Sequence, residues 1–271
     1  MDEKTSGCLK QTAIGCGVLI VIAIAFPLVM AVKMMTPFNR AVDSRHAIEE
    51  VFGPQESYVP PASGAPSADR IEVFLEVRRT LSVVCADLSS AEQQVQKLES
   101  FDDQDEVNRV DVLKQALSTT KSMMGVGPVI ARLYEIRNQS LLDAGMGLGE
   151  FTYIFAVAYR GRLLDPPQPN QLFGPTPINR RVRKALLSMV ENQLAVLRSE
   201  GGSEAEIAAV ATEIAALQAD EGRIPWQDGI PPAISEALAP YRAELDALYC
   251  PAMAPLELMI NKKHGPGFES L

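Results

Sequence analysis

The stretch Phe74–Leu98 (FLEVRRTLSVVCADLSSAEQQVQKL) carries the strongest structural signal in the chain. Its apolar residues form two rows with a spacing of seven residues, the period of a helix that packs lengthwise against another helix. All eight positions of the rows are apolar: Phe74, Leu81, Leu88 and Val95 in the first, Val77, Val84, Ala91 and Leu98 in the second. The stretch predicts a long helix, which Ser67 or Asp69 can cap, within an all-α fold.

Further helical patterns flank this stretch and place it in a long antiparallel hairpin. Apolar residues recur at helical spacing over 110–124 and again over 130–141, with an interruption at Gly125–Pro128. The prediction is a helical hairpin subdomain over 67–163. No sustained alternation of apolar and polar residues occurs, so strands should be few or absent.

A proline-rich connection at 164–177 is expected to separate this hairpin from a second helical subdomain and tail at 178–271. In the second subdomain, Gly201-Gly202 should join two amphipathic helices, since Ser203–Glu206 forms a capping box at the start of the second one. A last helical face is expected to break near Pro240.

An apolar run near the amino end predicts a membrane anchor. Ala13–Val32 (AIGCGVLIVIAIAFPLVMAV) has no charged residue, and a helix of this length is about 30 Å long, which matches the hydrocarbon core of a bilayer. A cleaved signal peptide is the alternative, but its apolar stretch would be shorter, and the candidate cleavage site Ala23–Ala25 lies inside the run. We expect a tail and uncleaved single-pass anchor over 1–35, then a juxtamembrane segment and Pro/Gly linker over 36–66.

The side of the membrane follows only weakly from the charges. Lysines and arginines flank the run almost equally, so the positive-inside rule scarcely orients it. Long following domains are exported largely regardless of nearby charge, and an acidic body is repelled by an anionic cytoplasmic leaflet. We therefore expect the body on the outer, periplasmic or extracytoplasmic side of the membrane.

Composition excludes several classes of protein. The 271 residues carry a formal net charge of −9, with 47% apolar and 22% charged residues. This composition is that of a folded chain, and the acidic balance argues against nucleic acid as a partner. The two histidines, His46 and His264, and the lack of any CxxC pair predict no metal site.

Cys85 is either a small core side chain or, if the body is exported, the disulfide partner of Cys250.

An aromatic stretch, Phe151–Tyr159 (FTYIFAVAY), follows three alternating glycines, Gly145, Gly147 and Gly149. This GxGxG pattern differs from a dinucleotide fingerprint and has no flanking strand, so it predicts a turn before a buried helix and no cofactor. The aromatic residues mark either the core or a groove for an apolar ligand. The candidate groove residues are Phe151, Tyr153, Phe155 and Tyr159.

Four basic residues crowd the start of the helix expected after 178, where the helix dipole favours negative charge. Either carboxylates of the chain itself or an anionic partner, such as a lipid headgroup or a phosphate, can offset this charge. The candidate contact residues are Arg180, Arg181, Arg183 and Lys184.

No catalytic residue is assigned, because the chain lacks the nucleophile, phosphate-binding and metalloprotease motifs. Glu150, beside the aromatic stretch, is the one carboxylate expected to be partly buried, and an ion pair explains such a residue more readily than catalysis does.

We expect a single-pass membrane-anchored helical interaction module, a non-catalytic scaffold or accessory subunit of a membrane or cell-envelope complex. The alternative is a membrane-tethered carrier or sensor for an apolar ligand or lipid. An enzyme that uses carboxylates is the weakest hypothesis, because no acid and base pair is recognisable.

Overall fold

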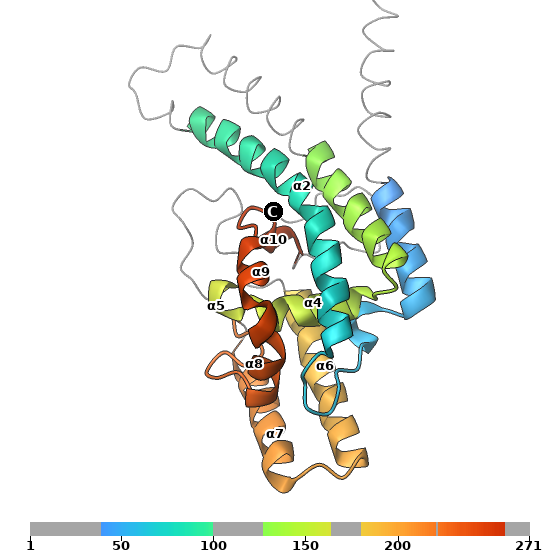
Figure 1. Cartoon of the computed structure of the whole chain (residues 1–271), viewed down its shortest axis with the longest axis vertical. Coiled ribbons are helices and arrows are strands. Elements are labelled where there is room, and N and C mark those ends of the chain that lie inside the picture. Colours follow the sequence, from blue (N-terminus) through green and yellow to red (C-terminus); the bar gives the residue numbers. More distant parts are fainter. Residues whose placement is uncertain (1–38, 100–126, 164–179, 221, 258–271) are drawn as a thin grey trace, which may run out of the picture.

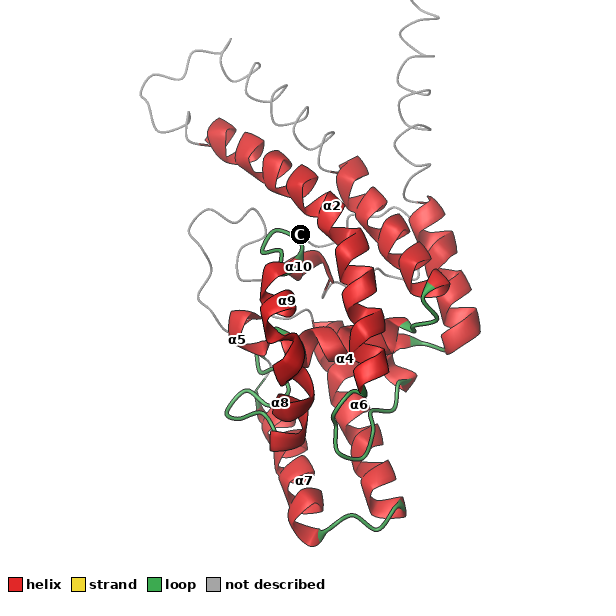
Figure 2. Ribbon diagram, in the orientation of Figure 1, coloured by secondary structure: helices red, strands yellow, loops and turns green. Residues whose placement is uncertain are grey.

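A computed structural model describes residues 39–99, 127–163, 180–220 and 222–257 (Figure 1). Within these ranges every regular element is an α or 3-10 helix and none is a strand, which confirms the all-α class (Figure 2). The predicted anchor Ala13–Val32 lies outside them. No single helix in the described ranges is long and apolar enough to cross a bilayer; Gly127–Asp143 and α4 (Leu148–Ala158) meet that criterion only as a pair bent by 106°.

The long predicted helix is α2 (Ala68–Glu99). It begins directly after Ser67, whose backbone carbonyl accepts hydrogen bonds from the N–H groups of Arg70 and Ile71. The two apolar rows face the core as far as their side chains are described, up to Leu88, while Val83 between them is 66% exposed. The buried members are Phe74, Val77, Leu81, Val84 and Leu88.

Two further helices, 39–52 and Gly127–Asp143, lie in the same part of the molecule (Figure 1). Asn138 donates from Nδ2 to the carbonyl of Ala41 at 3.2 Å and so joins the two helices. Arg132 pairs with Asp87 of α2 at 3.3 Å. Leu133 and Leu141 are buried as the hairpin predicts, whereas the other predicted partner of α2, 110–124, lies outside the described residues.

The hairpin expected around Gly201-Gly202 is confirmed as α6 (Arg180–Ser199) and α7 (Glu204–Ala219). Gly201 has φ +74°, a conformation that glycine adopts without strain. The Ser203 side chain accepts from the Glu206 N–H, and the Glu206 carboxylate accepts from the Ser203 N–H at 3.0 Å, which is the predicted capping box. The Glu206 carboxylate also accepts from the Ser203 hydroxyl at 2.6 Å. This bond, with that from the Ser203 N–H, lowers the pKa of Glu206.

The C-terminal part consists of short helices. α8 (Pro232–Leu238) passes into the 3-10 turn η2 (Ala239–Tyr241) and then α9 (Arg242–Ala247), so the expected break near Pro240 is present. α10 (Ala254–Glu257) follows. The other short elements are η1 (Gln55–Ser57) and α5 (Arg160–Leu163).

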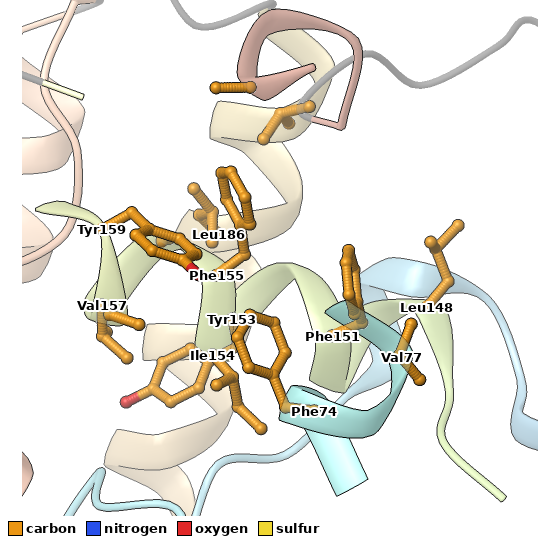
Figure 3. Close-up of a cluster of buried hydrophobic side chains, with 14 of the residues drawn as sticks. Phe74, Val77, Leu148, Phe151, Tyr153, Ile154, Phe155, Val157, Tyr159 and Leu186 are labelled. Atoms are coloured by element: carbon orange, nitrogen blue, oxygen red, sulfur yellow. The ribbon is translucent and has the colours of Figure 1, made fainter. Parts of the chain in front are cut away.

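α4 lies at the centre of the core. Every residue of α4 except Glu150 is buried, and its side chains meet residues of α2 and α6 (Figure 3). Buried residues before and after 164–177 belong to one continuous hydrophobic cluster. The connection itself lies outside the described residues.

Candidate functional site

The four aromatic residues expected to line a groove are all at most 1% exposed (Figure 3). Phe151 and Phe155 are one helical turn apart, and Tyr159 continues that face. Ring centroids lie 5.2 Å apart for Phe74 and Phe151, and 5.0 Å apart for Phe155 and Tyr159. The Tyr159 hydroxyl donates to the carbonyl of Leu245 at 3.1 Å. Burial raises the pKa of Tyr159 to about 12.

Tyr153 points elsewhere, because two residues along a helix turn the side chain by about 200°. Its ring packs on Tyr58, with centroids 5.8 Å apart, and its hydroxyl donates to the carbonyl of Gly64 at 2.8 Å. The four side chains therefore lie in two parts of the packed core. Binding of an apolar ligand to them stays a prediction.

The alternating glycines bring the loop 52–58 against the start of α4. Gly145 has φ +65° in the turn after Gly127–Asp143. A Cβ on Gly147 would lie 2.9 Å from Cβ of Phe52, and a Cβ on Gly149 would lie 2.4 Å from the carbonyl oxygen of Gln55. The pattern is thus a turn before a buried helix, as predicted, and two of its glycines also permit close approach of another segment.

Glu150, the one residue of α4 that is partly rather than fully buried, forms a two-point ion pair with Arg70 of α2. Nε of Arg70 lies 2.6 Å from Oε1, and Nη2 lies 2.5 Å from Oε2. Arg70 also donates to the carbonyl of Gly145 at 3.1 Å. The hydrogen bond to Glu150 raises the pKa of Arg70. This pairing is the ion pair that the sequence favoured as the explanation of a partly buried Glu150.

A small pocket of about 100 Å³ opens beside this ion pair. Phe52, 37% exposed, forms part of its wall, and Val51 and Val59, 66% and 47% exposed, adjoin the lining residues in sequence. We call Val51, Phe52, Val59 and the pocket the 51–59 surface. The pocket is lined by Phe52, Pro54, Tyr58, Gly147, Gly149 and Glu150.

Exposed apolar side chains concentrate in this region. Of the five large hydrophobic residues that are exposed in the described ranges, four fall between 42 and 59. Single exposed apolar residues are normal on a soluble surface, whereas a contiguous exposed apolar patch is typical of contact sites. The sequence pattern missed this surface, because it falls in the juxtamembrane segment and the loop that follows.

A second charge pair is completely buried. The guanidinium of Arg78 pairs with the carboxylate of Glu257, and the two side chains are 1% and 0% exposed. Nη2 of Arg78 donates to the carbonyl of Leu248 at 2.8 Å, and Cζ lies 5.3 Å from the ring centroids of Phe155 and Tyr159. Burial raises the pKa of Glu257, against the opposing effect of Arg78.

The expectation that Glu150 alone would be partly buried is wrong, since Glu257 is more deeply buried and so is Glu213. Glu213 accepts from the backbone N–H of Trp226 at 2.8 Å and pairs with Arg223 at 3.1 Å. The sequence held one signal of the buried pair between Arg78 and Glu257. Arg78 follows Phe74 by four residues, which places a charge on the apolar face of α2.

A hydrogen bond to α7 accounts for part of the positive charge at the start of α6. Arg183 donates from Nη2 to the carbonyl of Leu217 at 2.8 Å, in the last turn of α7. In an antiparallel hairpin the N-terminus of one helix lies beside the C-terminus of the other, where the dipole favours cations. Lys184 is exposed. The side chains of Arg180 and Arg181 lie outside the description, so an anionic partner at this cluster stays a prediction.

Cys85 and Cys250 form a disulfide, with Cα atoms 6.0 Å apart and a sequence separation of 165. This resolves the alternative that the sequence left open for Cys85. Across the described ranges, no group of three His, Cys, Asp or Glu side chains could hold a metal ion. His46 is exposed, and His264 falls outside those ranges.

Comparison of the chain with family models, with curated proteins and with solved structures gives no match.

Proposed function

We propose that this protein is a single-pass membrane-anchored interaction module, a non-catalytic scaffold or accessory subunit of a membrane or cell-envelope complex. Its anchor is the segment Ala13–Val32, and its helical body lies on the outer side of the membrane. The Cys85–Cys250 disulfide supports that side, because such bonds persist in oxidising compartments.

The 51–59 surface is the observation that carries the proposal. Residue 39 follows the proposed span by seven residues, which reach at most about 25 Å when extended. The exposed Val51 and Phe52 are the last two residues of helix 39–52. A partner subunit embedded in the same membrane would therefore lie within reach of this surface, and an anchor raises its effective concentration there.

The buried charges support a non-catalytic role. Arg78 with Glu257 and Arg223 with Glu213 are pairs inside the body. Glu150, on the wall of the pocket, is held at both carboxylate oxygens by Arg70. A general acid or base needs an available oxygen and a proton to exchange with substrate. These carboxylates are instead engaged in holding helices and loops together.

The test uses a pair of matched variants, because Val51 and Val83 are the same residue type and both are 66% exposed. Full-length protein is solubilised from its native membranes in detergent and weighed by native mass spectrometry. The wild type should carry a stoichiometric protein subunit. Val51→Glu should lower the bound fraction about tenfold, since a charge replaces apolar contact, whereas Val83→Glu on α2 should leave it unchanged.

Three results would count against the proposal. Equal recovery of the subunit with both variants would remove the 51–59 surface as the docking site. A wild-type chain that carries no protein would remove the accessory-subunit function. A chain that carries lipid in place of protein would favour the carrier alternative.

The side of the membrane is tested by labelling intact cells with a membrane-impermeant maleimide at a cysteine engineered within 164–177. Labelling without permeabilisation is expected. Labelling only after permeabilisation would place the body in the cytoplasm.

A further inference from the structure

The segment 248–257, here called the C-terminal strap, is fastened to α2 at two places. Cys250 is bonded to Cys85, and Glu257 pairs with Arg78. Arg78 and Cys85 are seven residues apart, which is two helical turns, so both lie on the same side of α2 and about 10 Å apart along its axis. The carbonyl of Leu248 also accepts from Arg78 at 2.8 Å.

The strap covers the aromatic part of the core. Arg78, which it encloses, lies over the rings of Phe155 and Tyr159. The Tyr134 hydroxyl donates to the carbonyl of Leu256 at 3.1 Å. Six strap residues are buried: Cys250, Ala252, Met253, Ala254, Leu256 and Glu257.

The strap has little structure of its own to keep it closed. Its one regular element is α10, of four residues, and so short a helix is unstable alone. A buried ion pair contributes little net stability, because removing both charges from water costs about as much as their attraction returns. The disulfide is the covalent bond between the strap and α2, and it acts together with the apolar burial of Met253 and Leu256.

We propose that the C-terminal strap is a redox-controlled lid: cleavage of the Cys85–Cys250 disulfide by a thiol reductant releases it from α2 while the helices beneath stay folded. A thiolate of the reductant attacks the sulfur of Cys85, because this residue is half-buried whereas Cys250 is 2% exposed. A second thiol of the reductant completes the exchange. Two cysteine thiols form, and the reductant becomes a disulfide.

Release would carry Glu257 into water and uncover Arg78 with the rings of Phe155 and Tyr159. The oxidised protein thus conceals a cationic and aromatic surface that the reduced protein displays. This inference does not depend on the membrane anchor or on the 51–59 surface.

Hydrogen exchange measured by mass spectrometry on the full-length chain in detergent tests the lid. Backbone N–H groups of Met253, Ala254 and Glu257 are hydrogen-bonded in the closed strap. With dithiothreitol, exchange in peptides of 248–257 should accelerate by about tenfold or more, whereas exchange in the α6–α7 hairpin should not change. Unchanged exchange in the strap overturns the proposal, and so does equal acceleration in the hairpin, because the disulfide would then hold the whole fold.

Two substitutions separate the disulfide from the ion pair. In the oxidised chain, Glu257→Gln should keep the strap closed, because the covalent bond still holds it. Glu244→Gln is the matched control. It removes the partner of Arg79 in an ion pair whose side chains are 50% and 41% exposed. It should leave exchange in the strap unchanged in both redox states. Strap opening in oxidised Glu257→Gln but not in the control would identify the ion pair as the gate and overturn the proposal.

Discussion

Replacing Arg78 by Met should destabilise the protein strongly at neutral pH and weakly in acid. Methionine keeps much of the arginine volume, but it leaves the carboxylate of Glu257 buried, since that side chain is 0% exposed. Removing one partner of a buried pair costs about 3–5 kcal/mol. The matched substitution Arg79→Met, which removes an ion pair that is 50% and 41% exposed, should cost about 0–1 kcal/mol.

The pH dependence has a definite sign. Burial raises the pKa of Glu257 in the folded protein, and the charges of Arg78 and Arg137 oppose this rise. Removing Arg78 takes away the larger of these two opposing effects. Because the folded pKa then exceeds the unfolded value of about 4.3, the folded state binds the proton more tightly. The cost of Arg78→Met should be smallest below about pH 4.3 and should grow as the pH rises through the folded pKa.

The assay is urea unfolding of the oxidised full-length protein in detergent, followed by fluorescence of Trp226, the single tryptophan, which is 5% exposed. The double variant with Arg78→Met and Glu257→Met should recover most of the lost free energy, because both buried charges are then gone. The reasoning is refuted if Arg78→Met costs no more than Arg79→Met at pH 7.5, or if its cost is the same at pH 4 and pH 7.5.

Gly149→Ala should lower the free energy of unfolding by about 1–3 kcal/mol in chemical denaturation, since its Cβ would lie 2.4 Å from the backbone oxygen of Gln55. The control Gly161→Ala, which has open space around it, should be neutral or stabilising. Equal effects of the two substitutions would contradict this explanation. Ser203→Ala should cost about 1 kcal/mol by loss of the cap, and an unchanged midpoint would show that the capping box is dispensable. In an alkaline absorbance titration the Tyr159 phenol, whose pKa burial raises to about 12, should ionise at higher pH than the tyrosines of the urea-unfolded chain, which ionise near pH 10. Since the folded pKa of this acid exceeds the unfolded value, its contribution to stability falls as the pH rises above about 10. Ionisation of Tyr159 near pH 10 in the folded protein, read from the difference between the wild type and Tyr159→Phe, would contradict its burial.

Local signals in the sequence were sufficient for most of the helical architecture. The apolar rows that begin at Phe74 and Val77 predicted the buried face of α2, and the capping box at Ser203 predicted the start of α7. Each of these features depends on residues within one or two helical turns. Their physical cause is contained in the stretch that displays them.

Contacts between segments far apart in the chain could not be predicted from local sequence patterns. Arg78 and Glu257 are 179 residues apart, and only the fold decides that these two charges meet. The basic residue Arg183 was noticed as a charge in an unfavourable place, yet its acceptor is a backbone carbonyl of α7, which has no signature in the side-chain sequence. Gly149 was assigned to a turn because its spatial neighbour, Gln55, lies far away in the chain.

Residues 58–66 end the segment that was expected as a juxtamembrane region and Pro/Gly linker, and they are attached at several points to the helices of the body. Asn192 donates to the carbonyl of Tyr58 at 3.1 Å, Gln193 donates to that of Ala62 at 3.1 Å, and Tyr153 donates to that of Gly64 at 2.8 Å. These hydrogen bonds fix the segment rigidly against the body. A force or rotation applied to helix 39–52 would therefore be transmitted directly to α4 and α6.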